Sequence, residues 1–478
     1  MNYKLVLRTI GLTISLEAIC LLLPAICSLV YSDGQIWWFV LCMAINLAVG
    51  LPLAAIKLTE RKMYSKEGFC IVALSWLALS TFGALPFVLS GSIPGFVDAF
   101  FETASGFTTT GASILSDVEA LPKSMLFWRS FTHWIGGMGV LVFLVALLPL
   151  SGGSNMYLLK AESTGPAVSK LVPKVKSTAK ILYVMYFGIT VIQVTLLVAG
   201  KMNLFDALTI SFGTVGTGGF GVLNDSMASY TTYQQIVVNV FMILCGINFS
   251  VFYLILIGKI KDVFKMTELR AYLGVIAVSI AIITVNCLGY YTTFWETLKH
   301  AAFQVGSIIT TTGFSTVDFD KWPELSKAVL VIIMFIGACA GSTGGGIKVS
   351  RILILIKSIF KEIKISAHPH TVYKIKLDGR TVEHETVRGV SVFLASYVVI
   401  YALSLLIISI DNMDFTTNFT AVAATINNIG PGLAKVGPSA NFGSYGILSK
   451  LVLTLDMLIG RLEIFPMLVL FSPHAWKK

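Results

Sequence analysis

The chain has 478 residues, of which 55% are hydrophobic and only 13% are charged, and its formal net charge is +10. A soluble globular chain carries about 25% charged residues, so this composition excludes a soluble domain and predicts a membrane protein. The basic residues are dispersed among short loops between apolar stretches. This dispersal argues against a nucleic-acid partner and indicates orientation in a lipid bilayer.

Apolar stretches of about 20 residues, the length that crosses a bilayer, follow one another along the chain. We predict ten spanning helices, at residues 5–31, 35–58, 69–89, 126–150, 181–199, 236–257, 272–290, 328–356, 392–410 and 451–471. With this count, the basic loops and both termini fall on one side of the membrane. The positive-inside rule makes that side cytoplasmic.

After the first two helices, one unit recurs: a helix, a short apolar half-segment, a threonine- or glycine-rich loop, and a second helix. The half-segments are too short to cross a bilayer, so both ends of each unit lie on the same side. They are residues 97–107, 205–215, 299–309 and 418–426. The repeats are therefore parallel, which suggests fourfold pseudosymmetry.

The predicted fold class is an all-α polytopic membrane protein. Two N-terminal helices are followed by four parallel helix–pore-loop–helix repeats around a pseudo-fourfold central pore. The predicted boundaries are 1–67 for the N-terminal helices and linker, and 68–160, 161–262, 263–365 and 366–478 for the four repeats.

Aligning the four loops on Gly111, Gly219, Gly313 and Gly430 places Thr109, Thr217, Thr311 and Asn428 in register. Rings of backbone carbonyls from re-entrant loops replace the hydration shell of a potassium ion, and glycine permits the backbone angles that turn carbonyls inward. We therefore predict an ion filter. Its potassium-binding residues are Thr109, Thr110, Gly111, Thr217, Gly218, Gly219, Thr311, Thr312, Gly313, Asn428, Ile429 and Gly430.

A glycine cluster at residues 337–346 interrupts the predicted span 328–356. Each glycine costs a helix about 1 kcal/mol relative to alanine, so the segment unwinds, and we expect it just below the filter with Lys348 at its far end. Arg461 lies inside the last span, where a charged side chain usually faces an interior partner. We expect it to hydrogen-bond carbonyls of the glycine segment. The alternative is that it pairs with Asp456 or Glu463 for packing alone.

The whole chain resembles the TrkH subunits of the Trk/Ktr/HKT superfamily of potassium transporters. Glycine at all four filter positions is similar to the potassium-selective members, and the two extra N-terminal helices are similar to the Trk branch. In the fourth filter, residues 427–429 depart from the TTT pattern, an asymmetry typical of TrkH. The motifs that carry the resemblance are residues 108–111, 216–221, 310–314, 427–432, 128–130, 134–139, 246–249, 340–348 and 460–463.

The resemblance implies potassium uptake through a gated, channel-like, potassium-selective pore. It implies an intramembrane gating loop, with gate residues Gly341, Gly344, Gly345, Gly346, Lys348 and Arg461. It also implies a multi-pass protein of a bacterial inner membrane with cytoplasmic termini. The expected partners are a second copy of the chain, in a homodimer, and a cytoplasmic, TrkA-like regulatory subunit that binds nucleotide.

Potassium is the only ligand predicted, without a covalent or organic cofactor. The sequence shows no nucleophile–base pair and no metal-ligand cluster, so an enzyme is not predicted. The alternative function is a sodium- or proton-coupled potassium symporter on the same scaffold, which the residues do not separate from a channel.

Overall fold

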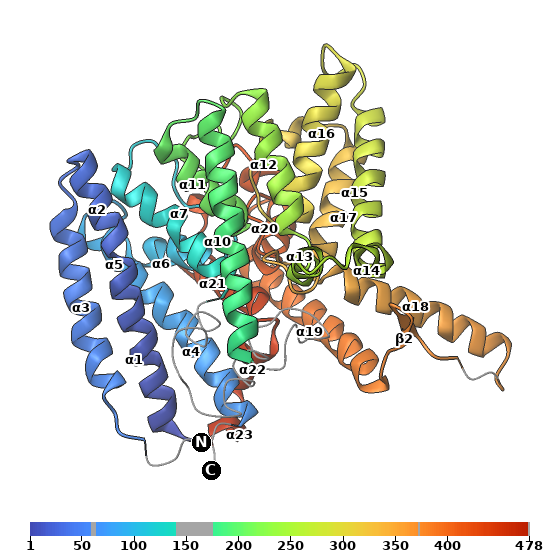
Figure 1. Cartoon of the computed structure of the whole chain (residues 1–478), viewed down its shortest axis with the longest axis horizontal. Helices are drawn as coiled ribbons and strands as arrows, with labels where there is room; N and C mark the ends of the chain where they lie inside the picture. The colour runs from blue at the N-terminus through green and yellow to red at the C-terminus, as the bar shows by residue number, and fades with distance from the viewer. Residues whose placement is uncertain (59–63, 140–174, 371–372, 477–478) are drawn as a thin grey trace.

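The computed structural model describes residues 1–58, 64–139, 175–370 and 373–476, which form helices joined by short loops (Figure 1). Within these ranges the strands form one hairpin, β1 (Lys376–Leu377) with β2 (Arg380–Thr381). The helices are α1 (Tyr3–Cys20), α2 (Leu22–Tyr31), α3 (Ile36–Ala54), α4 (Ser65–Gly83), α5 (Leu85–Leu89), α6 (Phe96–Phe107), α7 (Lys123–Gly137), α10 (Val175–Ala199), α11 (Leu204–Val215), α12 (Thr232–Cys245), α13 (Phe249–Leu256), α14 (Ile260–Lys265), α15 (Thr267–Asn286), α16 (Phe294–Ile309), α17 (Glu324–Ile336), α18 (Val349–Ala367), α19 (His384–Ile408), α20 (Phe415–Ile426), α21 (Ile447–Arg461), α22 (Phe465–Phe471) and α23 (Pro473–Trp476).

The two N-terminal spans stand at one edge of the molecule, where α1 packs along α3 and α4 (Figure 1). A Cβ added to Gly11 would lie 2.5 Å from the backbone nitrogen of Ala54, so only glycine allows this approach of α1 to α3. The chain ends meet, because the Tyr3 hydroxyl donates to the Trp476 carbonyl at 2.7 Å. Both termini therefore lie on one side, as an even number of crossings requires.

Six helical segments among the described residues are long and apolar enough to cross a membrane, and seven if the bent pair α12–α13 counts as one span. These seven coincide with seven of the ten predicted spans. Part of the predicted span 126–150 lies outside the described residues, as does the predicted boundary between residues 160 and 161. The two remaining spans are each divided between two helices, α17 with α18 and α21 with α22.

The predicted span 236–257 is divided between two helices and is not one continuous helix. The chain bends by 93° between α12 and α13, where Asn248 starts the second helix by accepting a hydrogen bond from Ser250 N. A new N-cap inside an apolar run begins a helix in a new direction. The last span also breaks, because Glu463 and Ile464 both have positive φ, at 55° and 72°.

The four half-segments are α6, α11, α16 and α20, close to the predicted ranges except that α16 begins at Phe294, five residues earlier than expected. Three of them start at side-chain N-caps: Asn203 for α11, Thr293 for α16 and Asp414 for α20. These caps satisfy backbone N–H groups that the first turn leaves unpaired. The C-terminal parts of all four half-segments are buried, at residues 101–107, 209–215, 303–309 and 420–426.

The longer helices present apolar side chains outward. On α10, Val184, Phe187, Val191 and Ile192 are exposed, although all four are large and apolar. A soluble protein rarely leaves such a surface uncovered, whereas lipid solvates it without cost. The structure is therefore that of a multi-pass membrane protein, with its polar loops enclosed by apolar helices.

Candidate ion filter and gate

The four loops that follow α6, α11, α16 and α20 share one backbone conformation. Their second residues, Thr109, Thr217, Thr311 and Asn428, all have left-handed φ angles between 54° and 58°. Such a conformation costs a residue other than glycine about 1–2 kcal/mol, and asparagine tolerates it best. These are the residues that the sequence alignment placed in register. We call residues 109–111, 217–219, 311–313 and 428–430 the filter ring.

Each half-helix enters the filter ring through the same cap. After α6, Thr109 N donates to Gly106 O at 3.0 Å, and Thr110 N donates to Ser105 O at 2.9 Å. The pair of hydrogen bonds is that of a Schellman motif, with a left-handed threonine where glycine is usual. The same two bonds recur after α11, α16 and α20, at 2.7–3.1 Å. The sequence thus builds the strained conformation locally, four times.

The four loops close into a ring. A Cβ added to Gly111 would lie within 3.0 Å of Gly218 O, and one added to Gly219 would lie within 3.0 Å of Thr312 O. In the same way, Gly313 meets Ile429 O and Gly430 meets Thr110 O. Each glycine therefore touches a carbonyl of the next repeat, and the fourth touches the first. The positive φ of these four glycines, 79–98°, further excludes larger residues.

The backbone carbonyls of the filter ring are available to a ligand. Within the described residues, the carbonyl oxygens of the twelve filter-ring residues accept no hydrogen bond. Buried carbonyls are normally paired, so a row of unpaired ones suits a cation that exchanges its water for carbonyl oxygen. The C-terminal ends of the four half-helices point at the same place, and their partial negative charge favours a cation there.

A cavity of about 200 Å³ opens on one end of the ring and is lined by Gly111, Gly219, Gly313 and Gly430. Acidic side chains lie near its rim. There the Asn224 amide donates to Asp117 at 2.9 Å and lowers the pKa of that carboxyl, which keeps it charged. Asn224 lines the cavity itself. The cavity therefore has carboxylates near its rim, and negative charge at the mouth of a cavity attracts cations.

At the other end of the ring lies the segment between α17 and α18, residues 337–348, which we call the gate loop. It is not helical, as predicted from its glycines, and it contacts the filter ring directly. Gly345 N donates to Thr311 Oγ1 at 2.6 Å. A Cβ on Gly344 would lie 2.8 Å from Thr310 O, and one on Gly345 would meet Asn427 O. Only glycine permits this contact with the third and fourth loops.

Charged side chains of α21, of α15 and of the loop itself hold the gate loop. Arg461 of α21 donates to Thr343 O at 2.8 Å and to the carbonyls of Gly136 and Gly137 at the end of α7. Lys348, which is buried and has φ of 86°, donates to Gly344 O. The third is Glu268 at the start of α15. Its Oε1 accepts from Ala340 N at 2.7 Å and from Ser350 N at 3.1 Å, so one carboxylate joins the loop to the first turn of α18.

The structure brings the predicted filter residues into one ring and the predicted gate residues into one loop beneath it, with Arg461 bonded to that loop as expected. Asp456 and Glu463, the alternative partners of Arg461, bond to Ser404 and Arg351. That these residues bind and gate an ion stays a prediction. Sequence reasoning missed Glu268, Glu102 and Arg129 as site residues. The sequence could have pointed to them, because all three are charged residues next to or within apolar segments, where a charge usually has an interior partner.

The fold and this site define a class of protein: a polytopic membrane protein in which four re-entrant loops meet in one ring. The TrkH family, described as cation transport proteins, matches residues 38–478. The chain belongs to this family. Because the members of this family are transporters, the prediction that the chain is not an enzyme is confirmed.

Individual relatives match over the full length of the chain. The Trk system potassium uptake protein TrkH of Salmonella typhimurium is 38% identical over 487 residues, and that of Escherichia coli K12 is 37% identical, with 100% of each chain covered. The crystal structure of the potassium transporter TrkH from Vibrio parahaemolyticus matches with a TM-score of 0.90 at 34% identity, again over 100% of both chains. The resemblance and the fold class drawn from the sequence are therefore confirmed.

Proposed function

We propose that this chain takes up potassium through a gated, potassium-selective pore whose filter is the filter ring. The observation that carries the proposal is the closed ring of four identical caps, which presents unpaired carbonyls at membrane depth. Irregular backbone persists there only where protein buries it or where it lines a water-filled path. The relatives named as potassium uptake proteins support potassium as the ion.

The pore would conduct potassium down its electrochemical gradient. An inside-negative potential contributes about 2.3 kcal/mol per charge per 100 mV. The acidic outer mouth would supply cations to the ring, and the gate loop would block their exit until it moves. The twelve filter-ring residues are the proposed potassium ligands, and the gate loop with Lys348 and Arg461 is the proposed gate.

We place the protein in a bacterial inner membrane, with both termini cytoplasmic. The excess of lysine and arginine in loops on the side of the termini supports this orientation. The relatives are named as proteins of a Trk system, and the word system supports the presence of further protein components. We propose a homodimer and a cytoplasmic, TrkA-like, nucleotide-binding subunit that moves the gate loop. The division into four repeats with the boundaries given above remains part of this proposal.

Rubidium uptake into proteoliposomes tests the transport proposal. Uptake should follow the membrane potential and persist without a sodium or proton gradient. Single-channel recording in planar bilayers should give discrete unitary currents that reverse at the potassium equilibrium potential. Uptake that requires a second ion gradient would contradict a channel. Absence of rubidium uptake by well-folded protein in the presence of its regulatory subunit would contradict the proposed function itself.

Proton-coupled symport on the same scaffold is the second candidate, and one observation favours it. Asp456 in α21 is 1% exposed, and while its Oδ1 accepts from Ser404 at 2.7 Å, its Oδ2 has no partner among the described residues. A buried carboxyl of this kind is suited to proton exchange. Under this candidate, Asp456→Asn abolishes any proton dependence of uptake, whereas in a channel it leaves the ion dependence as it was.

A further inference from the structure

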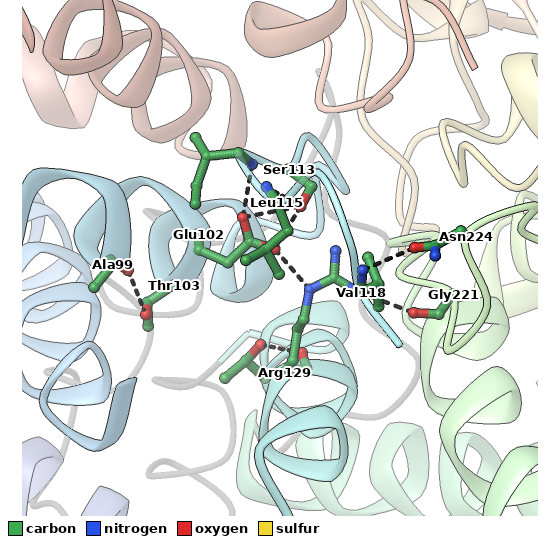
Figure 2. A network of polar contacts seen from close by, with 11 residues as sticks. Ala99, Glu102, Thr103, Ser113, Leu115, Val118, Arg129, Gly221 and Asn224 are labelled. Carbon is green, nitrogen blue, oxygen red and sulfur yellow. Dashed lines mark hydrogen bonds and ion pairs between the residues drawn. The ribbon is translucent and has the colours of Figure 1, made fainter. Parts of the chain in front are cut away.

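Glu102 of α6 and Arg129 of α7 form an ion pair beside the filter ring, with Arg129 Nε 2.6 Å from Glu102 Oε1 (Figure 2). Their side chains are 0% and 4% exposed, which makes this the most enclosed ion pair among the described residues. Neither residue belongs to the filter ring or touches the gate loop. An enclosed pair of charges is weak evidence for stability alone, because desolvation offsets much of the attraction. Because stability alone does not account for this ion pair, we look for its role in the residues that the two side chains contact.

The carboxylate of Glu102 bonds to the residues that follow the filter ring in the first loop. We call the residues that follow the ring glycine the outgoing limb of a loop. It accepts hydrogen bonds from Ser113 Oγ at 2.9 and 3.1 Å and from Ile114 N at 3.0 Å. These residues follow Gly111 by two and three positions. The limb reaches the fourth loop as well, because Phe442 N donates to Ser113 O at 2.8 Å.

The guanidinium of Arg129 holds the outgoing limb of the second filter loop. Its Nη1 donates to Gly221 O at 3.0 Å (Figure 2), and its Cζ lies 3.5 Å from the centre of the Phe220 ring. Phe220 directly follows the ring residue Gly219. One turn further along α7, His133 stacks on the same ring at 4.2 Å. The ion pair thus links the residues that leave the filter ring in the first and second loops.

Among the residues that the structure describes, no ion pair joins neighbouring loops at the other three seams. Met227 N donates to Ser315 O at 2.9 Å between the second and third loops, and Ala434 N donates to Asp320 Oδ1 at 3.1 Å between the third and fourth. The fourth and first are joined at Ser113. Nine positions before the ring glycines, Glu102 is matched by neutral residues in the other repeats: Ile210, Gln304 and Ala421. Asp320 also contributes a carboxylate, but within the described residues a pair of opposite charges joins only the first and second loops.

We propose that Glu102 and Arg129 are positioning residues that fix the distance between the first and second loops of the filter ring, and through it the preference for potassium over sodium. Selectivity by carbonyl coordination depends on the number and placement of the oxygens around the ion. Without the ion pair, the distance between the first and second loops is no longer fixed. Their carbonyl oxygens can then move closer together and coordinate a smaller ion. The inference rests on the proposed function as a potassium-selective pore.

The test is the potassium-to-sodium permeability ratio, from reversal potentials of reconstituted protein. Glu102→Gln removes the charge but keeps an oxygen for Ile114 N, and we expect the ratio to fall roughly tenfold, the effect of losing one charge-assisted hydrogen bond. Asp98→Asn is the matched control. Asp98 lies on the same helix and pairs with Lys450 at 2.6 Å, but this ion pair does not reach the filter ring. The control should keep the ratio of the parent protein.

The double variant Glu102→Gln, Arg129→Gln separates positioning from stability and serves if the single variant does not fold. Neutralising both partners leaves no lone buried charge, so folding is restored. If the pair only stabilises the protein, the double variant regains the parent ratio, and the inference is wrong. If the pair positions the loops, the ratio stays low in folded protein. A parent protein without potassium selectivity would instead contradict the proposed function, independently of both variants.

Discussion

The filter ring and the gate loop are both irregular, buried and rich in glycine, yet they are built differently. The filter ring takes its shape from its own backbone, through the same Schellman cap repeated four times, with left-handed residues at φ of 54–58°. The gate loop has no equivalent among the described parts of the other repeats, and it is held by side chains from α15 and α21 as well as its own Lys348. A locally determined structure is rigid, whereas one held by a few distant side chains is released when these change partner.

The largest effect is expected from Gly313→Ser in the filter ring. The new Cβ meets Ile429 O, and the residue keeps a φ of 90°, so the third loop must shift. A strain of about 2 kcal/mol corresponds to roughly a thirtyfold change, and we expect the potassium-to-sodium permeability ratio to fall by about that factor. Gly188→Ser is the control, because a Cβ at Gly188 has no neighbour within 4 Å. An unchanged ratio in Gly313→Ser would remove this glycine from the filter.

Arg461→Gln should act on the gate loop and leave the filter ring as it is. The variant loses charge-assisted hydrogen bonds to Thr343 O and to the end of α7, each worth about 1.5 kcal/mol or more. We expect potassium flux at a fixed driving force to rise about tenfold, with an unchanged permeability ratio. Arg388→Gln, at an exposed site on α19, serves as the control. A flux no higher than that of the control, at equal protein content, contradicts the role of Arg461 in closing the gate.

A smaller effect in the same direction is expected from Glu268→Gln. The amide oxygen still reaches Ala340 N and Ser350 N, but these bonds lose the charge that roughly doubles their strength. We predict that rubidium uptake rises about threefold, less than in Arg461→Gln. The exposed Glu385, near the start of α19, provides a control substitution of the same kind. Uptake equal to that of Glu385→Gln would show that the carboxylate does not restrain the loop.

The parts of the site that local sequence determines were predictable. Thr109, Thr217, Thr311 and Asn428 could be aligned because each loop repeats the same caps and glycines at the same spacing. The break between α17 and α18 followed from the low helix propensity of consecutive glycines. The all-α fold with four half-helices was also predicted correctly, because hydropathy and segment length are local properties of the sequence.

Charged residues in or beside apolar segments could be singled out from the sequence, but the tertiary contacts that they make were not predictable. The 93° bend between α12 and α13 requires Asn248 to act as an N-cap, and an asparagine in an apolar run gives no direction. The Glu102–Arg129 pair spans 27 positions and two helices, so no local spacing identifies it. Glu268 reaches the gate loop over 72 and 82 positions. Such partners are found only once the helices are packed.

The central claim is that selection and gating are separate: the filter ring selects the ion, and the gate loop at one end of that ring controls its passage. The most direct test is to shorten the gate loop within residues 341–346 and to measure potassium flux and the potassium-to-sodium permeability ratio on the same preparation. We predict a higher flux with the ratio of the parent protein. An equal or lower flux at normal expression, or a ratio that collapses together with the gate, would contradict the account.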